Sequence, residues 1–467
     1  MSDITIQSLR TSALTKALQS SVEPDAYKPT IQKSDPASAK EIITIDLGDL
    51  GLKSGTKRVD IPKTGLVHGV FVELSFSGIS SGGVDQQHTV FPPVLAAEWL
   101  DECTFMSHSR EICSIGSQMT VALVDALPET QRNLYMSLMG AKINSQLVPT
   151  SKDKDVLNIM LDNTGDNHGV VTVYLPIMLS PFMALGDHQK KQALWASFVE
   201  STQLRFKYKA AESLVIGNNN TKDSIGATGL KAKCHFITTV LDDRVYQESI
   251  KSTYSGPSVQ VLARKYHVIG EKDVEVAPLA ADILGSNVTF ELSTSASALC
   301  RALHIFVYRL EAKAGTTTAD LLNSGTKARN AFIKAEAACS RETGFEQIMS
   351  AKFTGGGRTI FDCNAETALL MSAQDGMTSA KDTLTNHFCY RFACDPSDGK
   401  YSGAISLSSV SSQNFKVTAF VKRRTKLAKN DTNGDYTCNY RMRIIAESYQ
   451  VNSTSSSDGS IKVALSV

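Results

Sequence analysis

The chain has 467 residues, of which 42% are hydrophobic and 20% charged, and its 48 basic and 47 acidic residues leave a formal net charge of +1. A chain of this length holds two to four domains at roughly 100 to 200 residues each, and its apolar content is enough for sizeable cores, which excludes a disordered protein. The balanced charge predicts no extended surface for a polyanion, so we expect no sequence-specific binding of nucleic acid.

Residues 1–56 are predicted to form an N-terminal arm and a lead-in to the folded part. The segment from Pro24 to Lys40 is rich in Pro, Ser, Lys and Asp, which favours an extended and flexible chain. Before it, apolar residues recur at helical spacing, and Asp3 is placed to cap the first turn. Two interpretations stay open for this stretch: an amphipathic helix on a membrane or neighbouring subunit, and a loosely ordered tail.

Residues 57–212 show the pattern of short strands separated by turns. Val70, Val72 and Leu74 alternate with Phe71 and Glu73, which is the two-residue period of a strand. Residues 95–105 and 111–123 are predicted to continue this sheet, residues 128–140 to form a helix, and residues 204–208 to form the last strand. Several short strands with few helices predict a β-sandwich or a jelly roll.

Residues 213–230 are rich in Asn and Gly and are predicted to link the first strand set to a second one. The second set comprises residues 233–240, 258–269, 288–292 and 301–310. Both faces of the strand at 301–310 are apolar, so we expect this strand to be covered on both sides. Residues 318–339 lack an internal Pro and are rich in Ala, Leu, Lys and Glu, which predicts a helical insertion in a long loop.

One order of elements occurs twice in the chain: a helix, a strand, a turn that contains Pro, and a strand preceded by Ser. The first copy runs through residues 128–139, 170–175 and 201–208, and the second through residues 364–373, 387–393 and 411–421. Each last strand is preceded by an S-x-Q triplet, Ser201 to Gln203 and Ser411 to Gln413. The repetition predicts two copies of one domain.

The sequence offers no pattern of an active site. The nine cysteines include no C-x-x-C pair, which argues against a structural zinc site and for reduced thiols. The nine histidines lie in no Ser/His/Asp or Cys/His motif. We therefore predict no catalytic, cofactor-binding or metal-binding residue, and we do not expect an enzyme.

Three short motifs have structural explanations that are simpler than a binding site. The glycines at 355–357 lack the phosphate-binding pattern, so a turn is expected there. Asp431, Asn433 and Asp435 form half of a calcium loop, but Met442 stands where the closing Glu would be, which favours a hairpin tip. The basic residues between Lys422 and Lys429 lack interleaved aromatics and are interpreted as a strand end or a subunit contact.

Three stretches resemble the double jelly-roll major capsid proteins of adenoviruses, tailless phages and large DNA viruses. Residues 401–409, Y-S-G-A-I-S-L-S-S, are similar to the P-S-G-x-x-N-F-S-R block of the second roll in large DNA viruses. Residues 98–105 with 112–118 resemble an early strand pair of the first roll, and residues 443–467 resemble the closing strands. The resemblance implies an all-β fold of two tandem eight-stranded antiparallel jelly rolls, at 57–212 and 231–467, with short helices in long loops.

The same resemblance implies a function and partners. The protein would be the structural subunit of a virion, assembled inside the host cell, whose pseudo-hexagonal homotrimers tile an icosahedral shell beside neighbouring trimers. Minor capsid or penton proteins and an internal membrane are further partners that it implies. The arm would then contact a neighbour or that membrane from beneath the trimer through Ile6, Leu9, Leu14 and Leu18.

The alternative function is a carbohydrate-binding, lectin-like β-sandwich, because jelly rolls also serve that purpose. A lectin of this kind should expose aromatic side chains on a concave sheet or carry a calcium site. The two tryptophans of the chain, Trp99 and Trp195, both lie in apolar contexts, which argues against this alternative.

Overall fold

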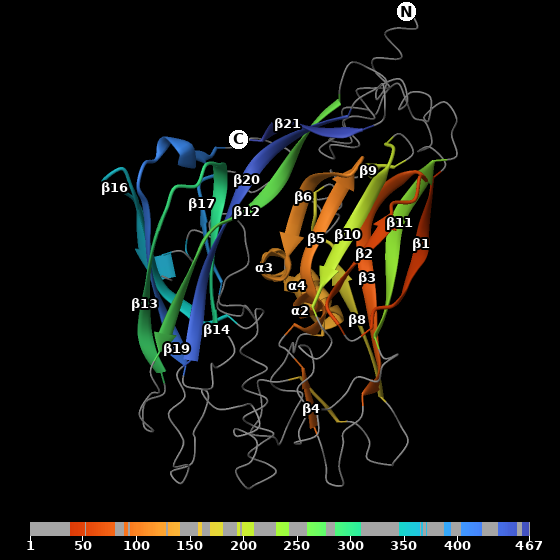
Figure 1. Cartoon of the computed structure of the whole chain (residues 1–467), viewed down its shortest axis with the longest axis horizontal. Coiled ribbons are helices and arrows are strands. Elements are labelled where there is room, and N and C mark those ends of the chain that lie inside the picture. The colour runs from red at the N-terminus through yellow and green to blue at the C-terminus, as the bar shows by residue number, and fades with distance from the viewer. Residues whose placement is uncertain are drawn as a thin grey trace, which may run out of the picture.

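The chain forms two β-sandwiches that stand next to each other (Figure 1). This computed structural model describes residues 38–51, 53–79, 88–91, 94–127, 129–140, 157–160, 169–180, 194–196, 199–209, 230–241, 259–276, 285–309, 345–364, 366–367, 370, 387–393, 403–422, 438–454 and 460–466. The arm residues Ile6, Leu9, Leu14 and Leu18, the insertion at 318–339 and the acidic loop at 431–435 lie outside these ranges.

The first half consists of two antiparallel sheets. One has the order β1-β11-β3-β8, with β9 also paired to β3, and is made of Ser38–Asp49, Leu230–Leu241, Leu66–Ile79, Gly169–Pro176 and Leu194–Trp195. The other has the order β2-β10-β5-β6 and is made of Gly55–Asp60, Thr202–Tyr208, Leu100–Ser107 and Arg110–Gly116. A separate pair joins β4 (His88–Phe91) to β7 (Leu157–Met160). The helices described here are α2 (Leu95–Trp99), α3 (Ser117–Asp125) and α4 (Glu129–Leu138).

The second half is built in the same way. Its first sheet has the order β12-β20-β14-β17, with β18 paired to β14 and β21 to β20, and is made of Val259–Val276, Cys438–Thr454, Leu299–Arg309, Phe388–Arg391, Ile405–Ser406 and Ile461–Ser466. Its second sheet has the order β13-β19-β15-β16 and is made of Gly285–Thr294, Gln413–Lys422, Gln347–Gly355 and Arg358–Asn364. A short 3-10 helix, η6 (Leu407–Ser409), precedes β19.

The two halves repeat one strand order. Counted along the chain within each half, the strands on these paths run first, eighth, third and sixth in one sheet, and second, seventh, fourth and fifth in the other. This order requires long crossovers between the two sheets, as in a jelly roll. The duplicated domain and the antiparallel jelly-roll architecture predicted from the sequence are therefore confirmed.

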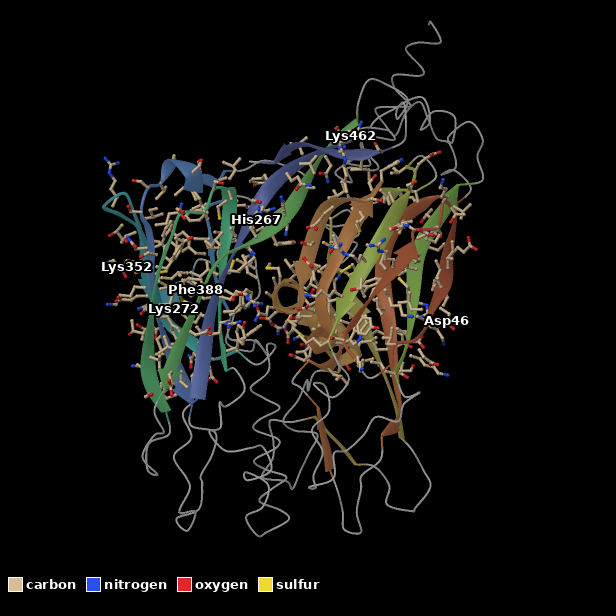
Figure 2. The ribbon with its side chains drawn as sticks, viewed as in Figure 1. Asp46, His267, Lys272, Lys352, Phe388 and Lys462 are labelled. Atoms are coloured by element: carbon tan, nitrogen blue, oxygen red, sulfur yellow. The ribbon has the colours of Figure 1, made fainter. Side chains whose placement is uncertain are left out.

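Alternating side chains build the cores, as the sequence predicted. In β19, Phe415, Val417 and Ala419 point inward and are buried, and Phe415 stacks on Phe353 with ring centroids 4.4 Å apart. Phe388 lies in the same interior, whereas Lys352 lies on the outside of this half (Figure 2). β19 thus presents an apolar face to the facing sheet and a more polar face away from it.

The strand predicted to be covered on both sides is β14, and this prediction is confirmed. Leu303, Ile305 and Val307 pack into the core of the second half. Phe306 and Tyr308 point the other way and belong to the core cluster that is centred on the first half. Because the two faces of β14 contribute to two cores, this strand lies at the junction between the halves.

The strand pairing assigns two segments differently from the sequence. Residues 38–49, which the sequence placed in the lead-in, form β1, and residues 231–241, which it placed in the second roll, form most of β11. β11 pairs with β1 and β3 and so closes the sheet of the first half. Such pairing joins segments far apart in the chain, and local periodicity carries no information about it.

Two segments predicted as strands contain helices. Residues 95–99 form α2, and the strand predicted over 111–123 ends at Gly116, where α3 begins. Every residue of α3 is buried, so its sequence shows no polar face from which a helical period could be recognised. The helix predicted at 128–140 is α4, and the glycine turn at 355–358 joins β15 to β16, with positive φ at Gly356 and Gly357.

Candidate functional site

The outer face of the sheet β12-β20-β14-β17 packs against the first half, and polar contacts link the two. Gln450 of β20 donates from Nε2 to the carbonyl oxygen of Ile112 in β6 at 2.9 Å. The backbone N–H of Ile461 in β21 donates to Oγ of Ser107 in β5 at 3.0 Å. These contacts, together with the shared core residues of β14, fix the orientation of one half relative to the other.

A row of ion pairs extends across the same sheet toward the first half. Arg441 of β20 makes a bidentate contact with Asp273 of β12, at 2.7 and 2.9 Å. Two residues further on, Arg443 binds Glu271 through Nε at 2.5 Å and donates from Nη1 to Oε1 of Gln118 in α3 at 3.0 Å. Arg443 thereby connects both strands to a helix of the other half.

A buried group of charged side chains lies further along this sheet, centred on Glu447 of β20. One carboxylate oxygen lies 3.2 Å from Arg264 of β12 and 3.7 Å from Arg301 of β14. The other lies 3.1 Å from Nε2 of His304 in β14. Burial alone would raise the pKa of Glu447, but Arg264, His304 and Arg301 outweigh this effect and hold the pKa well below its usual range. Glu447 is therefore a charged carboxylate that joins three cationic side chains.

Cys389 of β17 and His387, the residue just before that strand, extend this group toward the edge of the sheet. His304 pairs directly across the strands with Cys389. Burial alone would lower the pKa of His304, yet Cys389 and Glu447 raise it to about 9. Burial would likewise raise the pKa of Cys389, but His304 and Arg391 lower it. The thiol and the imidazole thus favour the charged form of each other.

His387 shows the opposite behaviour. Its ring stacks on those of His304 and Phe306, with centroids 6.1 and 5.7 Å away. Burial, the positive charge of His304 and that of Arg391 lower its pKa to about 3. The Nδ1 atom of His387 lies 3.7 Å from a carboxylate oxygen of Asp125 in α3. Because the imidazole is neutral above that pKa, we interpret this approach as a contact between the halves that is not an ion pair.

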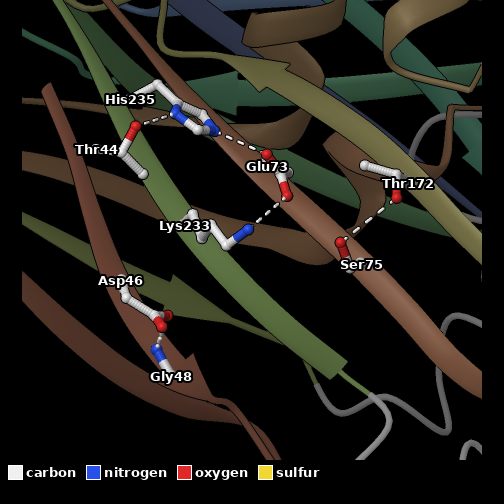
Figure 3. Close-up of polar contacts among 8 residues, drawn as sticks. All are labelled: Thr44, Asp46, Gly48, Glu73, Ser75, Thr172, Lys233 and His235. Atoms are coloured by element: carbon white, nitrogen blue, oxygen red, sulfur yellow. Dashed lines mark hydrogen bonds and ion pairs between the residues drawn. The ribbon is translucent and has the colours of Figure 1, made fainter. Parts of the chain in front are cut away.

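The corresponding sheet of the first half presents a polar surface instead. On the face of β1, β11 and β3 opposite to the core, His235 bridges Thr44 and Glu73 with two contacts of 2.9 Å, and Lys233 reaches the same carboxylate at 3.3 Å (Figure 3). The side chain of Lys233 is half-exposed. One half therefore buries this face of its sheet, and the other leaves much of it in contact with solvent.

The structure assigns a packing role to Leu407, which lies in the stretch 401–409, and to Gln413 of the second S-x-Q triplet. Leu407 of η6 is fully buried. Gln413 donates from Nε2 to the carbonyl oxygens of Leu407 at 2.7 Å and Ala296 at 2.8 Å, which holds η6 against the start of β14. A left-handed backbone occurs at Ser201, the first residue of one triplet, and at Ser412, the second residue of the other. The two triplets are therefore offset by one residue in the structure.

Trp99 has no exposed face for a sugar ring. It is fully buried and stacks on Tyr208 at 5.6 Å. The side chain of Trp195 lies outside the described residues. Among the described side chains, no group of three or more His, Cys, Asp and Glu residues could hold a metal ion. No helix in the described ranges has both the length and the apolar run needed to cross a membrane.

The sequence pattern does not reveal the cluster around Glu447. Arg441, Arg443 and Glu447 occupy alternate positions of one strand, which is the usual pattern of a solvent-exposed face. Only the packing of that face against the first half buries Glu447 and its partners, while Arg441 and Arg443 remain partly exposed. A partial signal was the two-sided apolar pattern of the neighbouring strand β14, which indicated that this sheet is covered.

No family profile and no curated protein matches the sequence. Solved structures do match the fold along nearly the whole chain. The PBCV-1 virus capsid is 15% identical over 94% of this chain and 99% of its own, with a TM-score of 0.57. The Faustovirus major capsid protein is 9% identical over 95% and 98%, with a TM-score of 0.53, and the mavirus major capsid protein is 10% identical over 95% and 95%, with a TM-score of 0.54. The chain therefore has the double jelly-roll fold of viral major capsid proteins.

Proposed function

We propose that this protein is a viral major capsid protein, the structural subunit of an icosahedral shell. The observation that carries this proposal is the likeness to capsid proteins over both halves and almost the full length of each chain. The repeated strand order and the fixed junction between the halves support it further. A structural role, with the virion as its location, fits this architecture better than a catalytic one.

Each half is proposed to be one eight-stranded jelly roll. The strands of the first roll are β1, β2, β3, β5, β6, β8, β10 and β11, and those of the second are β12 to β17, β19 and β20. The division that follows the pairing falls between β11 and β12, that is, between residues 241 and 259. This boundary lies after the linker at 213–230 that the sequence indicated.

The proposed assembly unit is a homotrimer. Two similar halves in a fixed arrangement give each subunit two similar edges, so three copies around a threefold axis have a pseudo-hexagonal outline. Cyclic symmetry makes each contact heterologous, with the first half of one copy against the second half of the next. A stable contact of this kind buries more than ~1,000 Å². Neighbouring trimers are the next partners, followed by minor capsid or penton proteins and an internal membrane.

The arm before β1 is proposed to hold assembled trimers together from beneath. Ile6, Leu9, Leu14 and Leu18 supply the apolar contacts, to a neighbouring subunit or to a membrane. Since β1 begins at Ser38 and pairs with β11, a deletion that tests the arm should end at residue 37 and keep that strand intact.

Sedimentation and electron microscopy test this function together. The full chain should sediment as a particle with about three times the 50.5 kDa mass of one subunit. At higher concentration it should form closed shells or hexagonal arrays. The chain without residues 1–37 should keep the trimer and lose the shells. A full chain that stays monomeric at all concentrations would contradict the capsid role, and normal shells from the truncated chain would contradict the role of the arm.

A further inference from the structure

Three side chains with complementary chemistry lie on one face of three neighbouring strands. Cys389 is on the edge strand β17, His304 is directly opposite on β14, and Glu447 is on β20. Nε2 of His304 lies 3.1 Å from a carboxylate oxygen of Glu447. A thiol beside an imidazole that is oriented by a carboxylate is the arrangement that activates a cysteine as a nucleophile.

The bond to Glu447 leaves the other ring nitrogen of His304 for the thiol. His304 is almost fully buried, and its Nδ1 atom has no hydrogen-bond partner among the described residues. In an antiparallel pair, side chains directly opposite each other have Cβ atoms about 5 Å apart, so the sulfur of Cys389 is the neighbouring group. Arg391, two residues along β17, adds positive charge that favours a thiolate.

Cys389 also differs from the other described cysteines in exposure. Cys103, Cys113, Cys234, Cys300 and Cys363 are buried, whereas Cys389 is partly exposed. Burial raises the pKa of each of the five buried thiols, for example that of Cys363 to about 11. Cys389 therefore combines an adjacent base with access from outside, the two conditions for a reactive thiol.

We propose that Cys389 is a nucleophilic thiolate and a site of oxidation by peroxides. The sulfur attacks one peroxide oxygen, an S–O bond forms, and the O–O bond breaks. The departing hydroxide takes the proton held by His304 and leaves as water, so that the cysteine becomes a sulfenic acid and is oxidised by two electrons while the peroxide is reduced. The imidazole becomes neutral in this step, and Glu447 loses one of its cationic partners. The inference does not depend on the capsid role.

The wild-type protein provides the first test. The full chain is treated briefly with iodoacetamide between pH 5.5 and 9, and each cysteine peptide is quantified by mass spectrometry. At pH 6.5 we expect alkylation of Cys389 to be at least about tenfold faster than that of Cys300, because the thiolate is the attacking species. As the pH is raised, the alkylation rate of Cys389 should reach a plateau before pH 8. A rate that rises about tenfold per pH unit up to pH 8.5, as for an ordinary thiol, would overturn the proposal.

Variants and peroxide give the second test. His304→Gln should restore an ordinary thiol pH profile at Cys389, whereas the control His267→Gln, which changes a histidine bonded to Ser448 in the same sheet, should keep the plateau. Hydrogen peroxide followed by a sulfenic-acid probe should label Cys389 in the wild type and leave Cys389→Ser unlabelled at this position. A folded His304→Gln protein with an unchanged plateau would refute the role of the imidazole. If that variant does not fold, the wild-type profile alone decides.

Discussion

A single carboxylate, that of Glu447, neutralises a concentration of positive charge inside the junction. Removing one partner of a buried ionic group leaves the others uncompensated, which typically destabilises a protein by 3–5 kcal/mol. Glu447→Gln keeps the shape of the side chain but leaves Arg264, Arg301 and His304 without their anion. We therefore expect its free energy of unfolding in urea to fall by about 3–5 kcal/mol.

The matched control is Glu291→Gln. Glu291 pairs with Lys416 at 3.0 Å in the other sheet of the same half, but both side chains are more than half exposed. Exposed pairs contribute little, so the change should be within about 0.5 kcal/mol. Equal effects of the two substitutions would show that the cluster around Glu447 does not have the electrostatic role described here.

The low pKa of His387 predicts a loss of stability in mild acid. The native ring stays neutral down to a pKa of about 3, whereas the unfolded chain binds a proton near pH 6.5. Between these values the unfolded state holds more protons, so stability is full above pH 6.5 and falls as the pH decreases. From pH 7 to pH 5 this group alone should remove about 2 kcal/mol, at 1.36 kcal/mol per pH unit.

Urea unfolding of the wild type and of His387→Gln at pH 7 and pH 5 measures this effect. The interval avoids the titration of carboxylates, and the groups facing His387 are His304, Arg391, Phe306 and Asp125. The variant should show a smaller decrease between the two pH values. An identical decrease in both proteins would mean that His387 does not titrate with a lowered pKa.

At the scale of elements, the start of β3 depends on a close approach of two backbones. Gly65 precedes β3 with a φ of +57°, and a Cβ atom there would meet the carbonyl oxygen of Thr239 in β11. Gly357, in the turn between β15 and β16, has a φ of +79° but open space around it. A side chain at either position would strain the backbone, because φ is positive at both. Only at Gly65 would the added Cβ atom also collide with a neighbouring strand.

Gly65→Ala should therefore be more destabilising than Gly357→Ala. We expect Gly357→Ala to lower the free energy of unfolding by about 1 kcal/mol. Gly65→Ala should lower it by about 1–3 kcal/mol more, because β3 or β11 must move to admit the methyl group. Urea unfolding of the two variants gives this comparison. A similar loss in both would indicate that the strand can shift without a penalty.

At the scale of the molecule, the two halves share core residues and should unfold together. Phe306, Tyr308 and Phe345 of the second half belong to the core cluster centred on the first, and the ring centroids of Phe306 and Phe345 lie 5.0 Å apart. Calorimetry of the full chain should show one cooperative transition. Phe306→Ala removes one of the side chains through which the second half joins that core, and it should split or broaden this transition. Phe290→Ala, a truncation inside the core of the second half alone, should mainly lower the Tm.

Two outcomes would contradict this coupling. Separate transitions in the wild type would show that the halves are independent domains despite their shared contacts. A Phe306→Ala protein that unfolds in the same manner as Phe290→Ala would show that the contacts through β14 do not transmit stability between the halves.

The sequence by itself determined the features that depend on local period. The alternation in β10 and β19, the two apolar faces of β14, the helix α4 and the turn at 355–358 all follow from side chains within a few residues of one another. The repeated order of these elements was enough to predict a duplicated jelly roll.

Only the tertiary structure decided which distant segments pair, because pairing depends on the burial that the whole chain achieves and not on any local pattern. It moved β11 into the first half, and it buried α3 so completely that no helical period is visible. It also brought His304 and Glu447, 143 residues apart, to within 3.1 Å. Alternating charges on a strand have the same pattern whether water or another sheet faces them, so the ionic junction could be recognised only once the two halves were in place.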